Sequence, residues 1–321
     1  MLARGGWPFR QDTFRVCPRS RRDGENPVLD FKPLNDIRCE LGEGPVYDDR
    51  RNALWYCDIV GKAIHCCELA TGDTRSWTMP SVVGSLGLAD SGKLVVALRD
   101  EVGMFDPDDG TFERIASIEA DEPDTRLNDG KVGPDGAFWV GTMDDGDVPV
   151  RRPIGSLYRV DAAGYVERKV DGLRVSNGLA FSPDGMTMFH SDSGGPWVDC
   201  WDFDPNTGAI SNRRRFANLD EATGRPDGGA TDVEGCYWSA GVSAARLNRF
   251  SPDGELIASY DLPVVAPTMP CFGGEGLDRI FVTSLRLGRD PAKLEAMPLT
   301  GTVIVADSPV VGSAVSRFRD V

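Results

Sequence analysis

Short polar turns followed by apolar runs recur along the chain at nearly regular spacing. Pro134-Asp135-Gly136 precedes Phe138-Trp139-Val140, for example, and Pro183-Asp184-Gly185 precedes Met188-Phe189. Six such units have turns at residues 50, 91, 135, 184, 234 and 275, at intervals of 41, 44, 49, 50 and 41 residues. Most units contain a second turn after another strand-like run, as at Thr71-Gly72-Asp73. Each unit is therefore predicted to hold two hairpins, and hence about four strands.

This spacing predicts the fold class. A four-stranded sheet repeated every forty to fifty residues is typical of a β-propeller blade. The chain lacks the long helical periods that an α/β fold would need. We therefore predict an all-β, six-bladed β-propeller with four-stranded blades around a central channel. The propeller is expected to form a single catalytic domain over residues 31–321.

The first thirty residues differ in composition from the rest. They carry six arginines against four acidic residues, three prolines and no sustained hydrophobic period. We predict a poorly ordered N-terminal extension over residues 1–30, with a misplaced start codon as an alternative. An arginine-rich transit peptide is disfavoured, because Asp12, Asp23 and Glu25 conflict with the usual lack of acids.

The net charge of the chain limits the classes of partner that it can bind. The 321 residues include 35 basic and 50 acidic side chains, a formal net charge of -15, which repels nucleic-acid phosphates and anionic membrane surfaces. No apolar run approaches the roughly 18 to 20 residues needed to span a bilayer. We therefore expect neither a nucleic-acid nor a membrane partner, a cytoplasmic location, and a monomer or weak homo-oligomer.

Cysteine and histidine usage limits the possible chemistry. The eight cysteines contain no Cys-x-x-Cys pair, so we predict reduced, mostly packed thiols rather than a zinc or redox site. The adjacent Cys66 and Cys67 would point to opposite faces of a strand, so at most one is expected to be buried. The two histidines, His65 and His190, are too few for a site that needs several imidazoles.

The repeat also predicts which residues face the channel. The innermost strand of every propeller blade runs along the axis, so residues in equivalent register form a ring. The residues seven positions before the six turns are Glu43, Gly84, Asn128, Asn177, Asp227 and Thr268. If the third unit is instead aligned on Gly130, Asp129 replaces Asn128 in this ring.

The ring favours a metal site. Two carboxylates and one or two carboxamides are the hard oxygen donors that calcium, magnesium or manganese prefer. Two neighbouring carboxylates in a partly dry channel would also need a cation to offset their repulsion. The alternative is a water-filled channel lined by polar side chains. We predict one divalent cation, with calcium as the leading candidate and zinc, magnesium, manganese and iron(II) as alternatives.

Several motifs, taken in order, resemble the regucalcin, gluconolactonase and luciferin-regenerating-enzyme family of six-bladed sugar lactonases. The resemblance covers most of the predicted propeller. Its motifs are Leu41-Gly-Glu-Gly-Pro45, Arg126-Leu-Asn-Asp-Gly-Lys131, Gly141-Thr-Met143, Ile154-Gly-Ser-Leu-Tyr158, Ser176-Asn-Gly-Leu179 and Arg225-Pro-Asp-Gly228.

The resemblance implies roles for individual residues. Glu43, Asn177 and Asp227 would bind the cation, the same three positions that the register count selects. Arg126 and Asn128 would contact substrate hydroxyls or a water ligand of the cation. Asp129 would shape the same pocket as a substrate-binding residue. An acidic substrate contact of the family falls near Asp144 and Asp145, and we leave it unassigned.

These inferences predict a metal-dependent hydrolase whose partner is a small-molecule sugar lactone. It would open an aldonolactone to the aldonic acid, with the metal polarising the carbonyl and activating water. Asp227 is the candidate catalytic base, and Trp197 lies in a predicted loop that could cover the channel. The alternatives are a phosphotriesterase-like or other ester hydrolase and a non-catalytic calcium-binding propeller, because the fold permits all three.

Overall fold

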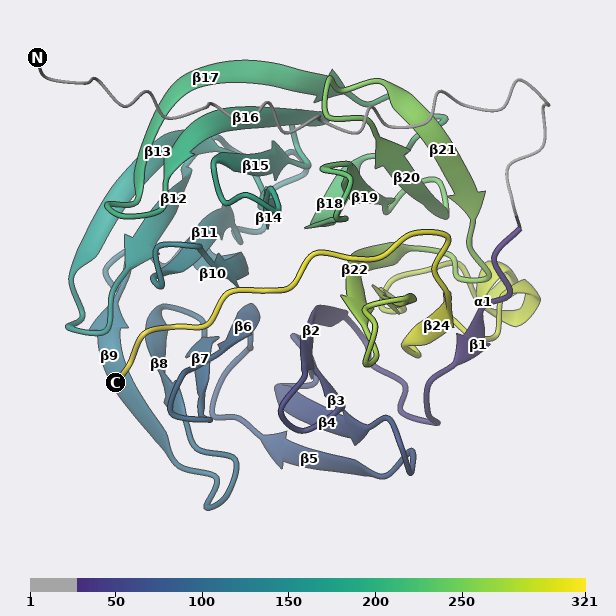
Figure 1. Cartoon of the computed structure of the whole chain (residues 1–321), viewed down its shortest axis with the longest axis horizontal. Helices are drawn as coiled ribbons and strands as arrows, with labels where there is room; N and C mark the ends of the chain where they lie inside the picture. The colour runs from purple at the N-terminus through teal and green to yellow at the C-terminus, as the bar shows by residue number, and fades with distance from the viewer. Residues whose placement is uncertain (1–27) are drawn as a thin grey trace, which may run out of the picture.

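The computed structural model describes residues 28–321, which form six four-stranded antiparallel sheets around a central axis (Figure 1). The first blade comprises β2 (Gly42–Asp48), β3 (Ala53–Asp58), β4 (Ala63–Glu68) and β5 (Thr74–Thr78). The second comprises β6 (Ser85–Leu88), β7 (Leu94–Ala97), β8 (Glu101–Phe105) and β9 (Phe112–Ser117). The third comprises β10 (Thr125–Val132), β11 (Phe138–Asp144), β12 (Gly155–Val160) and β13 (Val166–Leu173).

The remaining blades continue the same order, with the innermost strand first. The fourth comprises β14 (Ser176–Phe181), β15 (Thr187–Asp192), β16 (Trp197–Asp204) and β17 (Ala209–Asn218). The fifth comprises β18 (Pro226–Thr231), β19 (Tyr237–Gly241), β20 (Arg246–Phe250) and β21 (Leu256–Asp261). The sixth comprises β22 (Pro267–Gly273), β23 (Arg279–Ser284), β24 (Ile304–Asp307) and β1 (Lys32–Pro33). The predicted six-bladed propeller is therefore confirmed.

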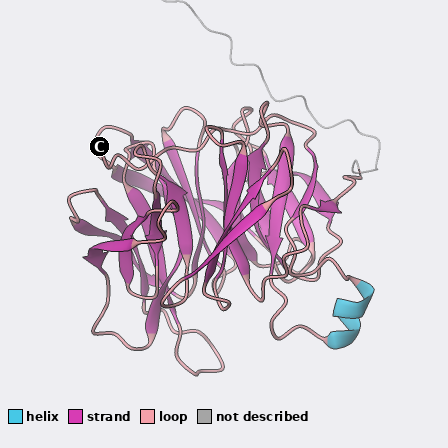
Figure 2. Cartoon of the chain, turned by 90° about the horizontal axis from the view of Figure 1, so that it is seen from below, coloured by secondary structure: helices cyan, strands magenta, loops and turns pink. Residues whose placement is uncertain are grey.

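The sixth blade closes the ring with a strand from the other end of the chain. Its outermost strand is β1, in which Lys32 pairs with Val305 of β24. The long connection from β23 to β24 carries the helix α1 (Pro291–Ala296), which explains why the second turn of this unit is weak in the sequence. In the side view, α1 lies at the face opposite the C-terminal end (Figure 2). Joining the two ends of the propeller in one sheet protects a strand edge that would otherwise be open.

Each blade packs its aromatic residues against the next. Trp139 of the third blade lies 5.5 Å from Phe203 and 6.3 Å from Phe181 of the fourth, measured between ring centroids. Strands in the middle of a blade are consequently covered on both faces. Cys66 and Cys67 of β4 are both buried, so the prediction that only one could be buried was wrong. The error arose because alternation predicts one wet face only where a sheet has no neighbour on that side.

The other sequence predictions have mixed outcomes. The seven cysteines among the described residues are all buried thiols outside any disulfide, as expected for packed thiols. The predicted extension over residues 1–30 falls almost entirely on residues 1–27, which lie outside the described residues. From residue 28 onward, no helix is long and apolar enough to cross a membrane.

Candidate active site

The inner strands carry β-bulges at similar positions along the channel. The register of β2 shifts between Glu43 and Val46, and that of β14 between Asn177 and Ala180. Similar shifts occur in β10, β18 and β22. A bulge disrupts the regular ladder and re-aims side chains, and bulges are frequent beside active sites. The predicted site residues that stand at or within these bulges are Glu43, Asn128, Asp129, Asn177 and Asp227.

Two glycines make the bends possible at Glu43 and Asn177. Gly44 and Gly178 follow these residues with φ angles of 55° and 65°, in the left-handed region that favours glycine. A Cβ on Gly178 would also come within 2.4 Å of the Ser191 Oγ atom. The backbone conformation of β2 and β14 therefore requires the glycine that follows Glu43 and Asn177 in the sequence.

Hydrogen bonds fix the orientation of both amides. Asn128 Nδ2 donates to Asn177 Oδ1 over 3.0 Å and to the Ser176 carbonyl over 2.9 Å. Asn177 Nδ2 donates in turn to Ser193 Oγ over 2.8 Å. Asn177 Oδ1 therefore keeps one lone pair for another partner, because a carbonyl oxygen has two.

The network continues from Asn128 to Arg126 and then to the loop after β11. Arg126 Nη1 donates to Asn128 Oδ1 over 2.9 Å, and Arg126 Nε donates to Asp145 Oδ1 over 3.3 Å. Arg126 Nη2 has no hydrogen bond within residues 28–321 and is available to a ligand. Asp145 also binds Arg99, whereas Asp144 is tied to Arg152. Of the two acids left unassigned from the sequence, Asp145 is therefore the one that contacts the site.

Glu43 and Asp227 face each other in a poorly solvated environment. Burial raises the pKa of Glu43 well above its ordinary value, and the nearby carboxylates of Asp227 and Asp129 raise it further. Burial likewise raises the pKa of Asp227 to about 8, with a further contribution from Asp129. Glu43 Oε2 accepts a hydrogen bond from the Gly44 N–H over 3.0 Å. Within residues 28–321, the Asp227 carboxylate accepts none, so its oxygens are open to a ligand.

Asp129 adds a third carboxylate beside this pair. Its Oδ2 atom accepts a hydrogen bond from the Leu179 N–H over 3.0 Å, which links β10 to β14. Its Oδ1 atom is buried without a partner. Burial raises the pKa of Asp129, while Lys131 lowers it. The Oδ1 oxygen can accept a hydrogen bond from a ligand that enters the site.

These groups suit a hard divalent cation. Glu43 and Asp227 offer carboxylate oxygens and Asn177 an amide oxygen, a donor set typical of calcium or magnesium. Their raised pKa values mean that two negative charges are poorly tolerated here unless a positive charge offsets them. Among residues 28–321, no three His, Cys, Asp or Glu side chains form a metal-binding group by themselves. A cation at this position would therefore depend on the Asn177 amide.

Two further residues named in the sequence analysis lie in packed positions. Trp197 does not cover the channel but packs against β17, where its ring lies 4.9 Å from the guanidinium of Arg215. His190 is fully buried and bonds to Ser176 Oγ over 2.8 Å, and burial lowers its pKa to about 3. It is thus a neutral packed residue.

Sequence reasoning missed two residues of this region. Ser193 lies in the turn after β15, where it accepts from Asn177 and donates to the Pro226 carbonyl over 2.5 Å. Nothing in its local sequence indicates this role. Lys131 is the last residue of the motif that begins at Arg126, but sequence reasoning assigned no role to it. Its ammonium donates to the Gly229 carbonyl over 2.9 Å.

Comparison with known proteins agrees with the predicted resemblance. Two curated relatives are a 6-deoxy-6-sulfogluconolactonase of Pseudomonas putida (37% identity, covering 87% of this chain and 94% of the relative) and an L-arabinolactonase of Azospirillum brasilense (36%, 89% and 94%). The crystal structure of a calcium-binding protein, regucalcin, from Agrobacterium tumefaciens has a TM-score of 0.86 with 29% identity, covering 91% of this chain and 98% of that one. The model of the family described as SMP-30/gluconolactonase/LRE-like region matches residues 41–286, and the chain therefore belongs to this family.

Proposed function

We propose that this protein is a divalent-metal-dependent hydrolase that opens a sugar (aldono) lactone to its aldonic acid. The proposal is supported by the proximity of the Glu43 and Asp227 carboxylates and by the hydrogen-bonded amides of Asn128 and Asn177, with Arg126 bonded to Asn128. It is also supported by a family whose relatives include two lactonases.

Each residue has a chemical task in this proposal. Arg126, whose Nη2 is free, would donate to sugar hydroxyls and orient the ring, and Asn128 holds Arg126 in place. The open carboxylate of Asp227 would accept the proton of the attacking water at an oxygen atom. Asp129 would accept a hydrogen bond from a substrate hydroxyl at its unpartnered Oδ1. A cation held by Glu43, Asn177 and Asp227 would supply Lewis-acid polarisation of the lactone carbonyl.

A non-catalytic calcium-binding propeller is the second candidate. It is favoured by the solved regucalcin, which is described as a calcium-binding protein. A cation site alone would not require Arg126 to be buried beside the amides and locked onto Asn128. A phosphotriesterase-like or other ester hydrolase would use the same groups on a different substrate.

A direct test is acid release from a panel of glucono-, galactono-, xylono- and arabinolactones, with aryl esters and a phosphotriester as further substrates. Rates must be corrected for spontaneous ring opening. The proposal expects turnover of at least one sugar lactone that is lost in chelator and restored by calcium, magnesium, manganese or zinc. Turnover that chelator leaves unchanged would contradict it, and faster turnover of the ester or phosphotriester would favour the alternative hydrolase.

Stabilisation by calcium should depend on pH. In the metal-free folded protein, the pKa of Asp227 is raised from 3.8 to about 8, so the folded state binds a proton that the unfolded chain has released. The metal-free protein therefore loses stability as pH rises between these values. Calcium needs the deprotonated carboxylates, so its stabilising effect should grow over the same range.

Thermal unfolding with and without calcium checks this prediction. At calcium about 100 times above its Kd, we expect Tm to rise by about 5 °C near pH 8 and by much less near pH 5. Equal stabilisation at both pH values would show that calcium binds elsewhere.

Replacing Arg126 with lysine should impair substrate positioning. Lysine cannot contact Asp145, Asn128 and a sugar hydroxyl at once, because it lacks the planar fork. We expect kcat/KM to fall by about 10- to 100-fold, mainly through KM. Arg99→Lys is the matched control, since Arg99 also binds Asp145 but is more exposed. An equal effect of the two substitutions in steady-state kinetics would argue against a substrate contact by Arg126.

A further inference from the structure

A C-terminal segment, residues 308–320, crosses one end of the propeller after β24. We call it the C-terminal strap, and it appears as the yellow trace over the middle of the molecule in Figure 1. The Ser313 N–H donates to the Thr231 carbonyl on β18 over 3.0 Å, and the Phe318 N–H donates to the Leu88 carbonyl on β6 over 2.8 Å. Phe318 is fully buried. The strap is thus anchored on both sides of the channel.

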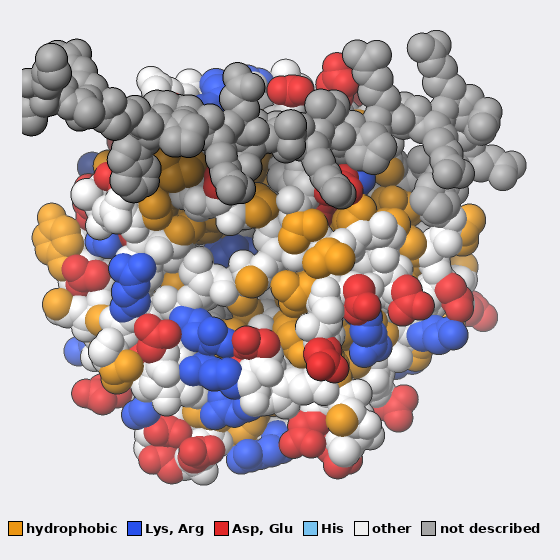
Figure 3. All heavy atoms as spheres, viewed as in Figure 1, with side chains coloured by type: hydrophobic (Ala, Val, Ile, Leu, Met, Phe, Trp, Pro, Cys, Tyr) orange, Lys and Arg blue, Asp and Glu red, His pale blue; other side chains and the backbone are white. Residues whose placement is uncertain are grey.

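The strap covers the end of the channel away from the candidate active site. The inner strands begin near Glu43, Asn177 and Asp227, and the strap binds where β6 and β18 end. On the strap face, hydrophobic side chains are visible near the middle and charged ones are more frequent toward the lower edge (Figure 3).

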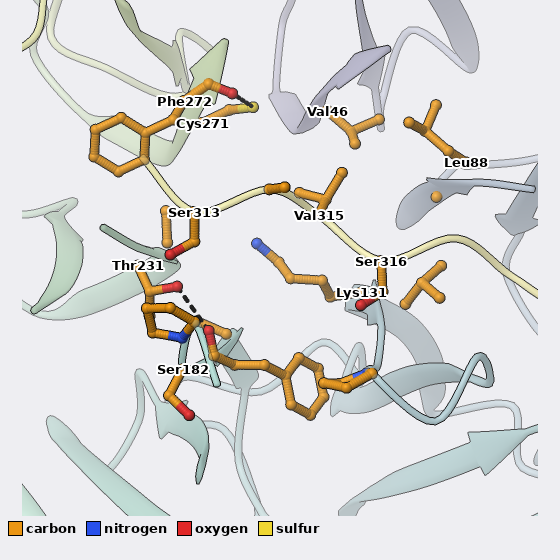
Figure 4. A pocket seen from close by; sticks show the side chains of 18 of the residues that line it. Val46, Leu88, Lys131, Ser182, Thr231, Cys271, Phe272, Ser313, Val315 and Ser316 are labelled. Atoms are coloured by element: carbon orange, nitrogen blue, oxygen red, sulfur yellow. Dashed lines mark hydrogen bonds between the residues drawn. The ribbon is translucent and has the colours of Figure 1, made fainter. Parts of the chain in front are cut away.

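A cavity of about 230 Å³ lies beneath the strap, between the ends of the inner strands (Figure 4). Its walls combine polar groups with apolar side chains, among them Val46, Leu88, Phe272 and Val315. None of the predicted metal or substrate residues lines it. An apolar cavity of about 150 Å³ holds the six carbons of benzene, so this one has room for roughly nine non-hydrogen atoms.

Lys131 gives the cavity a positive charge. Its ammonium points into the space beneath the strap and donates to the Gly229 carbonyl, which uses one of its three protons (Figure 4). Among residues 28–321, no carboxylate oxygen lies within 4.0 Å of this nitrogen. Burial lowers the pKa of Lys131, while the more distant Asp129 and Glu43 raise it. An ammonium withdrawn from water without a close anion is costly, so an anionic ligand here would be stabilising.

A second donor lies on the strap. Ser313 Oγ is buried without a hydrogen-bond partner, and Ser313 lines the same cavity. The carboxylate among the lining residues belongs to Asp184, which is exposed and bonded to Ser182. Lys131, with two protons to spare, and the hydroxyl of Ser313 can therefore both donate to a ligand in the cavity.

We propose that the cavity beneath the C-terminal strap binds a small monocarboxylate with an apolar body, its carboxylate accepting hydrogen bonds from Lys131 and Ser313. A single cation matches a single negative charge, so a doubly charged phosphate or sulfate would leave one charge unpaired. An aldonate fits less well, because the lining hydroxyls of Thr231 and Ser182 already donate to the Phe181 carbonyl and to Asp184. The apolar side chains of the lining offer no partners to its several hydroxyls. This site does not depend on the proposed lactonase activity.

Calorimetric titration of the full chain in calcium-containing buffer tests the proposal, with benzoate and hexanoate as probes. Benzyl alcohol and hexan-1-ol are their neutral counterparts. We expect the carboxylates to bind at least about tenfold more tightly than the alcohols, because a charge-assisted hydrogen bond is lost with the alcohol. Excess gluconate should not displace them. Absence of carboxylate binding at about 10 mM, or displacement by gluconate, would overturn the proposal.

Two variants separate the contribution of the Lys131 charge to binding from that of the cavity volume. Lys131→Met keeps the volume but removes the charge, so carboxylate affinity should fall at least about tenfold while the alcohols are little affected. Val315→Trp should fill the cavity from the strap and weaken binding of both probe classes. Lys293→Met, an exposed change on α1, is the control. Unchanged carboxylate binding in Lys131→Met would refute the site. If that variant does not fold, unchanged binding in Val315→Trp would refute it.

Discussion

Replacing Asp227 with asparagine is expected to lower kcat/KM for lactone hydrolysis by about 1,000-fold or more. Asparagine keeps the size of the side chain and one oxygen, but it cannot accept a proton at neutral pH. Among residues 28–321 the half-buried Asp227 carboxylate accepts no hydrogen bond, so an oxygen is open to take the proton of the attacking water. The loss should fall mainly on kcat, since Arg126 and Asn128 would still position the sugar.

The matched control for Asp227→Asn is Asp202→Asn, which changes an exposed carboxylate on β16 bonded to Asn212 and Arg214. It should leave the rate unchanged. Both variants should also keep the circular dichroism spectrum of a folded propeller. Retention of a tenth or more of the wild-type rate by Asp227→Asn would exclude Asp227 as the base.

Replacing Glu43 with glutamine is expected to weaken calcium binding by at least about 100-fold, as measured by calorimetric titration. A neutral amide halves the negative charge supplied by the two carboxylates. The same substitution should raise the unfolding free energy of the metal-free protein near pH 8. Burial and the Asp227 charge both raise the Glu43 pKa, so an ionised Glu43 is a destabilising group without a cation.

Opposite changes in affinity and stability distinguish a metal ligand from a residue that only supports the fold. A merely structural Glu43 would lose metal-free stability when substituted and leave calcium affinity unchanged. Glu113→Gln on β9 is the control, because Glu113 is exposed on an outer strand. It should alter neither quantity.

The fold could be predicted because its signals are local. Turns such as Pro134-Asp135-Gly136 and the apolar runs after them specify hairpins through short-range chemistry, and six repeats specify the ring. Closure by β1 and the C-terminal strap could not be predicted. Lys32 pairs with Val305 and Ser313 with Thr231, contacts between distant segments that carry no periodic signal.

Part of the candidate site could be predicted from the strand register. Counting from the turns places Glu43, Asn177 and Asp227 at one level; in the structure Asp227 lies near enough to raise the pKa of Glu43, and Asn177 bonds to Asn128. The bulges, however, put Asp227 inside the irregular segment of β18, whereas Glu43 and Asn177 stand at the edge of theirs. Counting along a sequence cannot reveal a bulge, because the extra residue has no side-chain signature of its own.

The cooperation of Glu43, Asn177 and Asp227 in holding one divalent cation is most directly tested by a crystal structure of the calcium-loaded protein, with anomalous scattering to identify the ion. We expect one ion about 2.3–2.6 Å from an oxygen of each of the three side chains. A calcium-saturated crystal in which these oxygens turn away from one another, with the ion bound elsewhere or absent, would contradict this account.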